Sequence, residues 1–180
     1  FQYRPRDIRK NLGPRSRSII INSPSNPTGN LLEPEVMGEI ADLSGRGLYV
    51  MSDEVYHGLV YESREHSILE FTDNAFVLGG FSKLYAMTGW RLGFLIAPAE
   101  YVRPIQKMQQ NLFISANAFV QRAEIAALTE AGEEVAAMVR TYDERRRFML
   151  PRLREIGFGV AVEPHGAFYI LANARRFTED

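Results

Sequence analysis

The sequence contains no cysteine, which excludes a disulfide framework, a thiolate zinc site and a cysteine nucleophile. It contains only three histidines, and these lie too far apart along the chain to indicate a metal centre. Charged residues nearly balance, with a formal net charge of -1, so nothing in the electrostatics favours nucleic acid or an anionic membrane as a partner. We therefore expect no metal, no nucleic acid and no membrane among the ligands of this protein.

Long apolar runs are also missing. No segment approaches the roughly 20 apolar residues that a membrane-spanning helix needs, and residues 1–18 carry charge without the apolar stretch of a secretory signal. These features lead us to expect a cytoplasmic protein. Hydrophobic residues make up 46% of the 180 positions, enough to bury the core of one domain, or of one domain and part of another.

Four short apolar segments, each bounded by turn residues, have the pattern of buried strands. They are residues 18–22, 48–51, 75–78 and 92–97. A helix is predicted between the first two, because Glu33–Glu35 places proline and acidic residues at its first turn. A strand, a helix and a strand within some thirty residues predict a parallel pair with a right-handed crossover.

The pattern becomes helical after Pro98. Helices are predicted at about 99–114, 117–130 and 132–156. Pro151 is expected to kink or interrupt the last of these, and the run Arg145–Arg147 to form a solvated helix face. Two short strands near 158–163 and 167–172 are expected to begin a second, small domain.

Three polar segments follow predicted strands. They are Asn22–Gly29 (NSPSNPTG), Ser52–Tyr56 (SDEVY) and Gly79–Gly93 (GGFSKLYAMTGWRLG). In open α/β sheets, ligands bind in the crevice beyond the carboxyl ends of the parallel strands. We therefore expect these segments to meet at one edge of the sheet and to form a ligand site there.

In this order, the three segments resemble those of class I/II aminotransferases, which belong to fold type I of the pyridoxal 5'-phosphate (PLP) enzymes. The stretch YAMTGWRLGF is similar to the subgroup of many bacterial and archaeal aspartate aminotransferases, and Gly166–Ile170 (GAFYI) also resembles a family motif. The resemblance implies an α/β fold: part of the three-layer sandwich of the family's large domain, with a mostly parallel sheet. It assigns residues 1–140 to the C-terminal part of that large domain. Residues 141–180 would be the beginning of a small α+β domain.

The resemblance assigns the catalytic role to Lys83, which would form the Schiff base with PLP. Ser82 and Arg91 would bind the cofactor phosphate, Arg91 through its planar guanidinium. A lysine or an arginine taken alone is more often a solvated surface charge. The functional interpretation depends on these residues occurring together and in the order of the family.

The remaining cofactor ligands come from the first two segments. Asp53 would face the pyridine nitrogen and keep it protonated, which lets the ring accept electrons. Tyr56 and Asn26 would donate hydrogen bonds to the phenolic oxygen of the ring, and the resemblance implies a cis peptide between Asn26 and Pro27. Taken alone, Asp53 would be read as a cap or turn residue, Tyr56 as a packing residue and Asn26 as part of a turn.

The chain departs from the family in several ways. Family members are longer, with an earlier phosphate-binding loop, an aromatic residue stacked on the ring and, beyond the GAFY motif, an arginine for the substrate carboxylate. Gly80 also stands where many relatives have serine or threonine. We therefore expect these 180 residues to be part of a longer, homodimeric enzyme. By themselves they are expected to bind PLP weakly, if at all, and to show negligible turnover.

The expected reaction of the longer protein is transfer of an amino group from an amino acid to a 2-oxo acid, with ping-pong kinetics. One alternative is a PLP-dependent C–S lyase, for which the same lysine, aspartate and tyrosine would serve. Another is a regulatory or binding module without catalysis, and a third is the remnant of a truncated chain.

Overall fold

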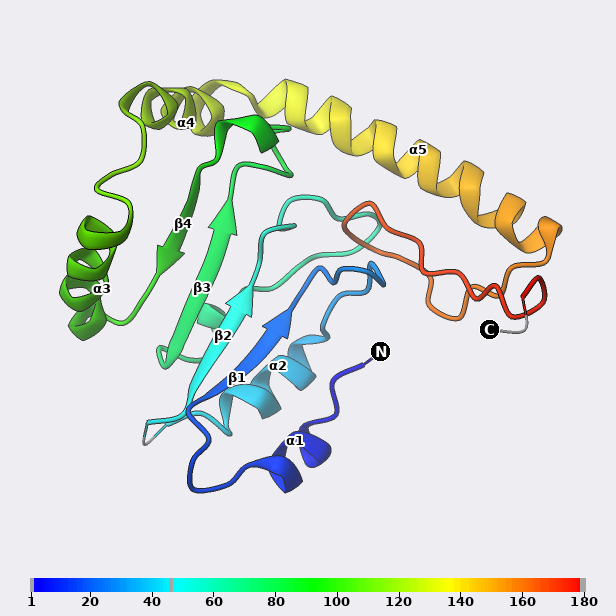
Figure 1. Ribbon diagram of the computed structural model, residues 1–180. Coiled ribbons are helices and arrows are strands. Elements are labelled where there is room, and N and C mark those ends of the chain that lie inside the picture. Colours follow the sequence, from blue (N-terminus) through cyan, green and yellow to red (C-terminus); the bar gives the residue numbers. More distant parts are fainter. Residues whose placement is uncertain (1, 46, 179–180) are drawn as a thin grey trace.

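The computed structural model describes residues 2–45 and 47–178 and has an α/β fold built around one four-stranded sheet (Figure 1). The strands, in spatial as well as sequence order, are β1 (Ser18–Asn22), β2 (Tyr49–Asp53), β3 (Ala75–Gly80) and β4 (Gly93–Ile96). The first three strands are parallel and β4 pairs antiparallel with β3. The four strands expected before Pro98 are confirmed, and the sheet is mostly parallel.

The helices are α1 (Pro5–Asn11), α2 (Pro34–Ala41), α3 (Ala99–Leu112), α4 (Ala118–Glu130) and α5 (Gly132–Ile156), with 3-10 turns η1 (Ile68–Glu70) and η2 (Thr88–Trp90). Helix α2 connects the parallel strands β1 and β2, as the crossover prediction requires. The prediction of an interruption at Pro151 is wrong, because α5 continues through it to Ile156. The helix ends where Gly157 adopts a left-handed conformation with φ of 109°.

The main core lies on one face of the sheet. Side chains alternate between faces along a strand, so Ile19 and Ile21 of β1 point into the core, where both are buried. Met37 and Ile40 of α2 cover them and are fully buried. Burying an aliphatic side chain of this size contributes about 1.5–3 kcal/mol, so this layer holds α2 against the strands that carry the polar segments.

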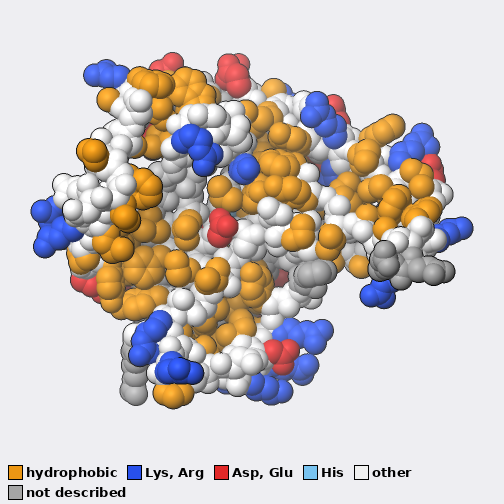
Figure 2. Space-filling model, in the orientation of Figure 1, with side chains coloured by type: hydrophobic (Ala, Val, Ile, Leu, Met, Phe, Trp, Pro, Cys, Tyr) orange, Lys and Arg blue, Asp and Glu red, His pale blue; other side chains and the backbone are white. Residues whose placement is uncertain are grey.

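The opposite face of the sheet is open. Ile20, Leu78 and Leu95 lie on it and have exposed fractions of 66%, 40% and 44%. The strand register places Leu78 beside Leu95 and, across β2, on the same side as Ile20. We call these three residues the open sheet face. Figure 2 shows that hydrophobic side chains cover much of this side of the molecule.

The expected strands near 158–163 and 167–172 are not formed. The structure has only isolated bridges there, Gly159 with Asn173 and Gly166 with Val60. The backbone of residues 165–167 bonds instead to two loops: the N–H groups of His165 and Gly166 both donate to the carbonyl of Gly29. These two residues lie in the turn between the expected strands, so their bonds hold that turn against the Gly29 loop. The Ala167 N–H, at the start of the second expected strand, donates to the Leu59 carbonyl and is not available for a ladder.

The run Arg145–Arg147 is only partly a solvated face. Arg146 is buried, with an exposed fraction of 7%. Its guanidinium lies 2.8 Å from an Asp143 oxygen and 2.9 Å from a Glu62 oxygen. It also stacks 5.2 Å from the ring centre of Tyr61. The loop that follows β2 covers this side of α5, and Arg146 provides the charge that pairs with the two carboxylates.

Within the described residues, no helix is long and apolar enough to cross a membrane. A search of the same part of the chain finds no group of three or more histidine, aspartate or glutamate side chains arranged to hold a metal ion.

Candidate active site

The carboxyl ends of the three parallel strands lie at one edge of the sheet. Asn22 at the end of β1 pairs in register with Asp53 at the end of β2, and Asp53 pairs with Leu78 of β3. The Asn22 side-chain amide also donates to the Asp53 carbonyl at 3.0 Å. The polar segments expected to meet therefore begin side by side, as parallel pairing requires.

Tyr56 lies at the centre of the site. It is buried, with an exposed fraction of 4%. Its hydroxyl oxygen accepts a hydrogen bond from the Asn26 side-chain amide at 3.4 Å and lies 2.7 Å from the Tyr169 hydroxyl. Burial, followed by the hydrogen bond with Tyr169, raises the pKa of Tyr56, while the Asn26 bond acts in the opposite direction.

The amine of Lys83 faces this aromatic group. Its Nζ lies 5.8 Å from the ring centre of Tyr56 and 5.9 Å from that of Phe168. Lys83 is half-buried in the turn that follows β3. Lys83, Tyr56 and Asn26, which are distant in sequence, are thus brought together.

The backbone of the first polar segment turns sharply. The predicted cis peptide between Asn26 and Pro27 is confirmed, and the Ser23–Pro24 peptide is also cis. The Asn26 N–H donates to the side-chain oxygen of Asn22 at 2.7 Å. In this turn the Asn26 side-chain amide points towards the Tyr56 hydroxyl.

Asp53 lies at the end of β2 and is half-buried. One of its carboxylate oxygens accepts a hydrogen bond from the Val55 N–H at 3.2 Å. A carboxylate held in this way by the following turn keeps its other oxygen available to a ligand. The side chain shares a face of the sheet with Leu78, its partner in register on β3.

Ser82 and Arg91 lie on the two arms of the β3–β4 hairpin. The ladder ends where Gly80 pairs with Gly93, and the Phe81 N–H donates to the Leu92 carbonyl at 3.5 Å. Ser82 and Arg91 are the next residues on the two arms. Among the described residues, the hydrogen bond that the Arg91 guanidinium makes is to the Thr88 carbonyl, at 3.1 Å. Within the part of the chain that the structure describes, Arg91 makes no hydrogen bond to Ser82 or Lys83.

The sequence interpretation assigned no role to Phe168 or Tyr169, although it recognised the motif that contains them. Their position is set by the preceding residues: Ala167 N–H donates to the Leu59 carbonyl at 2.9 Å, next to the Gly29 contacts described above. Gly29 has φ of +67°, and a Cβ there would come within 2.4 Å of Pro164. Glycine is therefore required where the two segments meet.

Glu54 is a second residue that sequence reasoning missed. It is buried, and its Oε1 accepts hydrogen bonds from Ser52 Oγ at 2.8 Å, Ser67 Oγ at 3.2 Å and the Ile68 N–H at 3.0 Å. These bonds tie the end of β2 to η1. Since Glu54 lies between Asp53 and Tyr56 in sequence, it supports the segment that carries them.

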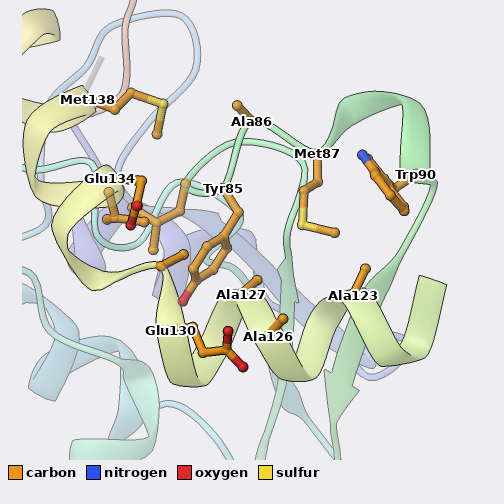
Figure 3. A pocket seen from close by; sticks show the side chains of 13 residues that line it. Tyr85, Ala86, Met87, Trp90, Ala123, Ala126, Ala127, Glu130, Glu134 and Met138 are labelled. Atoms are coloured by element: carbon orange, nitrogen blue, oxygen red, sulfur yellow. The ribbon is translucent and has the colours of Figure 1, made fainter. Parts of the chain in front are cut away.

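A separate cavity of about 560 Å³ lies on the other side of the Lys83 turn (Figure 3). Figure 3 shows Tyr85, Met87 and Trp90 from this turn facing alanines and acidic residues of the helices. Neither Lys83 nor Tyr56 lines the cavity. We therefore place the candidate active site at the strand ends, where nucleophilic and hydrogen-bonding groups converge, and not in this cavity.

Comparison with known proteins agrees with this geometry. Residues 3–177 match the family described as aminotransferase class I and II. The chain is 41% identical to the (5-formylfuran-3-yl)methyl phosphate transaminase of Methanocaldococcus jannaschii, over 90% of this chain and 44% of the relative. It is 36% identical to the aspartate aminotransferase of Pyrococcus horikoshii, over 94% of this chain and 44% of the relative.

The same likeness holds in three dimensions. The solved aspartate aminotransferase of Thermus thermophilus, in its structure with maleate, has a TM-score of 0.92 at 32% identity, covering 99% of this chain and 48% of that one. The chain thus spans about half the length of the curated relatives and solved structures that it matches. On sequence and structure together, the chain belongs to the class I and II aminotransferase family.

Proposed function

We propose that this protein takes part in the transfer of an amino group from an amino acid to a 2-oxo acid, with PLP as cofactor and Lys83 as the catalytic residue. The observation that carries the proposal is the position of the Lys83 amine over the rings of Tyr56 and Phe168, at the carboxyl ends of the strands. Family membership supports the reaction class.

The chemistry of the side chains fits PLP. An amine can form an imine with the aldehyde of the cofactor, and a carboxylate can pair with the protonated pyridine nitrogen. A phenol and an amide can donate hydrogen bonds to the ring oxygen, and a guanidinium with a hydroxyl can bind the phosphate. We propose that Asn26, Asp53, Tyr56, Ser82, Lys83 and Arg91 hold the cofactor in this way. PLP, when bound, supplies an electron sink for bond breaking at the substrate Cα.

The protein side chains contribute orientation and proton transfer. Lys83 Nζ would anchor the aldehyde, and the same amine, when free, would take the proton from the substrate Cα as general base and deliver it as general acid to the carbon of the cofactor. Asp53 holds a proton at the pyridine nitrogen, and Tyr56 with Asn26 donates to the ring oxygen. Burial of Tyr56 keeps water away from its hydroxyl and strengthens these hydrogen bonds.

The wider assignments are also proposals. We propose that residues 1–140 belong to the large PLP-binding domain and residues 141–180 to the small one, and that the functional unit is a homodimer in the cytoplasm. The substrates are an amino acid and a 2-oxo acid. The relatives carry aminotransferase names with different substrates, so the side chain of the amino acid is left open.

The central assignment can be tested by chemical trapping. The sequence has only three lysines, Lys10, Lys83 and Lys107, and the first and last lie exposed on α1 and α3. Borohydride reduction in a PLP titration, followed by peptide mass mapping, should label Lys83 at PLP concentrations that leave the other two unlabelled. A Lys83→Ala variant should lose this labelling and the near-visible absorbance of the bound cofactor.

The matched control is the double variant Lys10→Ala, Lys107→Ala, which should keep both signals. Equal labelling of all three lysines would contradict the assignment. Transfer itself is tested in the longer protein, by supplying an amino acid, PLP and 2-oxoglutarate and measuring glutamate. Products of C–S bond cleavage in place of glutamate would favour the lyase alternative, which no feature of the structure supports over the transferase.

A further inference from the structure

We propose that Tyr169 is a positioning residue for the cofactor: its hydroxyl holds the Tyr56 hydroxyl so that Tyr56 donates its proton to the ring oxygen of PLP. The inference rests on the proposed function and adds a residue to its site. The observation behind it is the 2.7 Å contact between the two hydroxyl oxygens, which joins residues 113 positions apart.

The direction of the hydrogen bonds follows from the number of protons available. A phenol has one proton to donate and can accept further hydrogen bonds at its oxygen. The Asn26 amide already donates to the Tyr56 oxygen. If Tyr56 donates to a ligand, its contact with Tyr169 is a hydrogen bond only when Tyr169 is the donor.

This arrangement has an energetic consequence. With Asn26 and Tyr169 both donating to its oxygen, Tyr56 becomes a stronger donor, because hydrogen bonds in a chain polarise one another. Without a ligand, the Tyr56 proton can point to Tyr169 instead, which stabilises the neutral phenol. The raised pKa of Tyr56, caused first by burial and then by the hydrogen bond with Tyr169, agrees with this second state.

Ring contacts and backbone hydrogen bonds hold the Tyr169 hydroxyl in place. Its ring meets that of Tyr56 edge-on, with centres 5.6 Å apart, and the neighbouring Phe168 ring makes a similar contact at 5.5 Å. The preceding residue is held on both sides, since the Ala167 N–H donates to the Leu59 carbonyl and the Ala167 carbonyl accepts from the Tyr61 hydroxyl. A hydroxyl held this firmly can orient its partner.

The first experiment needs no cofactor. In protein labelled with carbon-13 at the tyrosine rings, the Tyr56 signal is identified by its loss in Tyr56→Phe and followed by NMR as the pH is raised. In this cofactor-free state the Tyr56 proton points to Tyr169, so the Tyr169→Phe variant, which keeps the ring and removes the hydroxyl, should shift the titration midpoint of Tyr56 downwards. Such a shift would show that the two hydroxyls are hydrogen-bonded, as the proposal requires. The matched control is Tyr142→Phe, whose ring stacks on Phe168 at 5.4 Å, and it should leave the midpoint unchanged.

The second experiment measures PLP affinity in a double-mutant cycle. Tyr169→Phe should weaken PLP binding about fivefold, the effect of one net hydrogen bond. In the Tyr56→Phe background the same change should have no effect, because Tyr169 acts through Tyr56. An equal loss in both backgrounds would mean that Tyr169 only supports the fold, and an unchanged Tyr56 midpoint would also overturn the proposal.

The two experiments separate this inference from the proposed function. If Lys83 stays unlabelled by PLP in the longer protein, the proposed cofactor is wrong, whereas the titration of Tyr56 still reports on Tyr169. If Lys83 is labelled and Tyr169→Phe titrates and binds PLP as the wild type does, only the role of Tyr169 is refuted.

Discussion

At the residue scale, tyrosine hydroxyls account for much of the polar chemistry around the candidate site. The Tyr56 hydroxyl contacts Asn26 and Tyr169. The Tyr61 hydroxyl donates to the Ala167 carbonyl just before the Phe168–Tyr169 pair. Both side chains have exposed fractions of only 4%. Their ionised forms would have to exist away from water, which makes the site sensitive to alkaline pH.

Tyr61 provides a test of this pH dependence. Burial raises the pKa of Tyr61 to about 12, although Arg146 nearby acts in the opposite direction. An unfolded tyrosine has a pKa of about 10. Because the folded value is the higher one, the contribution to stability is complete below about pH 10 and is lost as the pH rises through about 12.

Urea unfolding at several pH values should therefore show a smaller alkaline loss of stability in Tyr61→Phe than in the wild type. The variant should also be about 1 kcal/mol less stable at neutral pH, because the Ala167 carbonyl loses its donor. A Tyr85→Phe control changes a phenol at the separate cavity and should follow the wild-type profile. An identical alkaline slope in Tyr61→Phe and the wild type would contradict the prediction.

At the scale of elements, α5 is joined to the rest of the molecule by ionic and hydrogen bonds. Arg146 pairs with Asp143 of its own helix and with Glu62 of the loop after β2, and its Nη1 donates to the Pro164 carbonyl at 3.1 Å. Arg147 pairs with the same two carboxylates from a more exposed position. The network connects the helix to both segments that hold Phe168 and Tyr169 in place.

Replacing Arg146 tests the importance of this connection. Arg146→Ala leaves the Pro164 carbonyl without this donor, and Asp143 and Glu62 keep only the more exposed Arg147 as a cationic partner. Because Arg147 and solvent offset part of the lost pairing, we expect a loss of about 2 kcal/mol, below the usual cost of breaking a fully buried ion pair. Arg140→Ala, at an exposed position of the same helix, is the matched control and should change stability by less than about 0.5 kcal/mol. Equal unfolding midpoints in urea for the two variants would show that the network contributes little.

At the scale of the whole molecule, the two faces of the sheet differ. One face is covered by α2 and buries Ile19, Ile21 and Val50. The other presents Ile20, Leu78 and Leu95, the open sheet face, to solvent. Contiguous exposed apolar surface of this kind promotes association.

We predict that this chain, expressed by itself, associates through its open sheet face as its concentration rises. The triple variant Ile20→Thr, Leu78→Thr, Leu95→Thr should shift the sedimentation profile towards the monomer at concentrations where the wild type is associated. Ile156→Thr, at an exposed position near the end of α5, is the control and should associate as the wild type does. A wild type that stays monomeric throughout the concentration series would refute the prediction.

The sequence by itself determined the local elements, and its resemblance to a family supplied the candidate site residues. Each of the four strands was predicted from a short apolar run, and the cis peptide between Asn26 and Pro27 was what the resemblance implied; both are present. The resemblance to a family proposed Lys83, Asp53 and Tyr56 as site residues, and parallel pairing brings the strand ends near them together whatever the details of packing. The strand predictions succeeded because the interactions that control a strand lie within a few residues.

The tertiary structure decided the contacts between distant segments. The pattern of 158–163 and 167–172 suggested strands, but the Ala167 N–H donates to the Leu59 carbonyl, and the turn between the two ranges is bonded to the carbonyl of Gly29. Arg146 has the local pattern of a solvated residue and is buried because the loop carrying Glu62 covers it. Tyr169 meets Tyr56 for the same reason: the path of the chain through loops decides which groups meet, and local periodicity carries no information about that path.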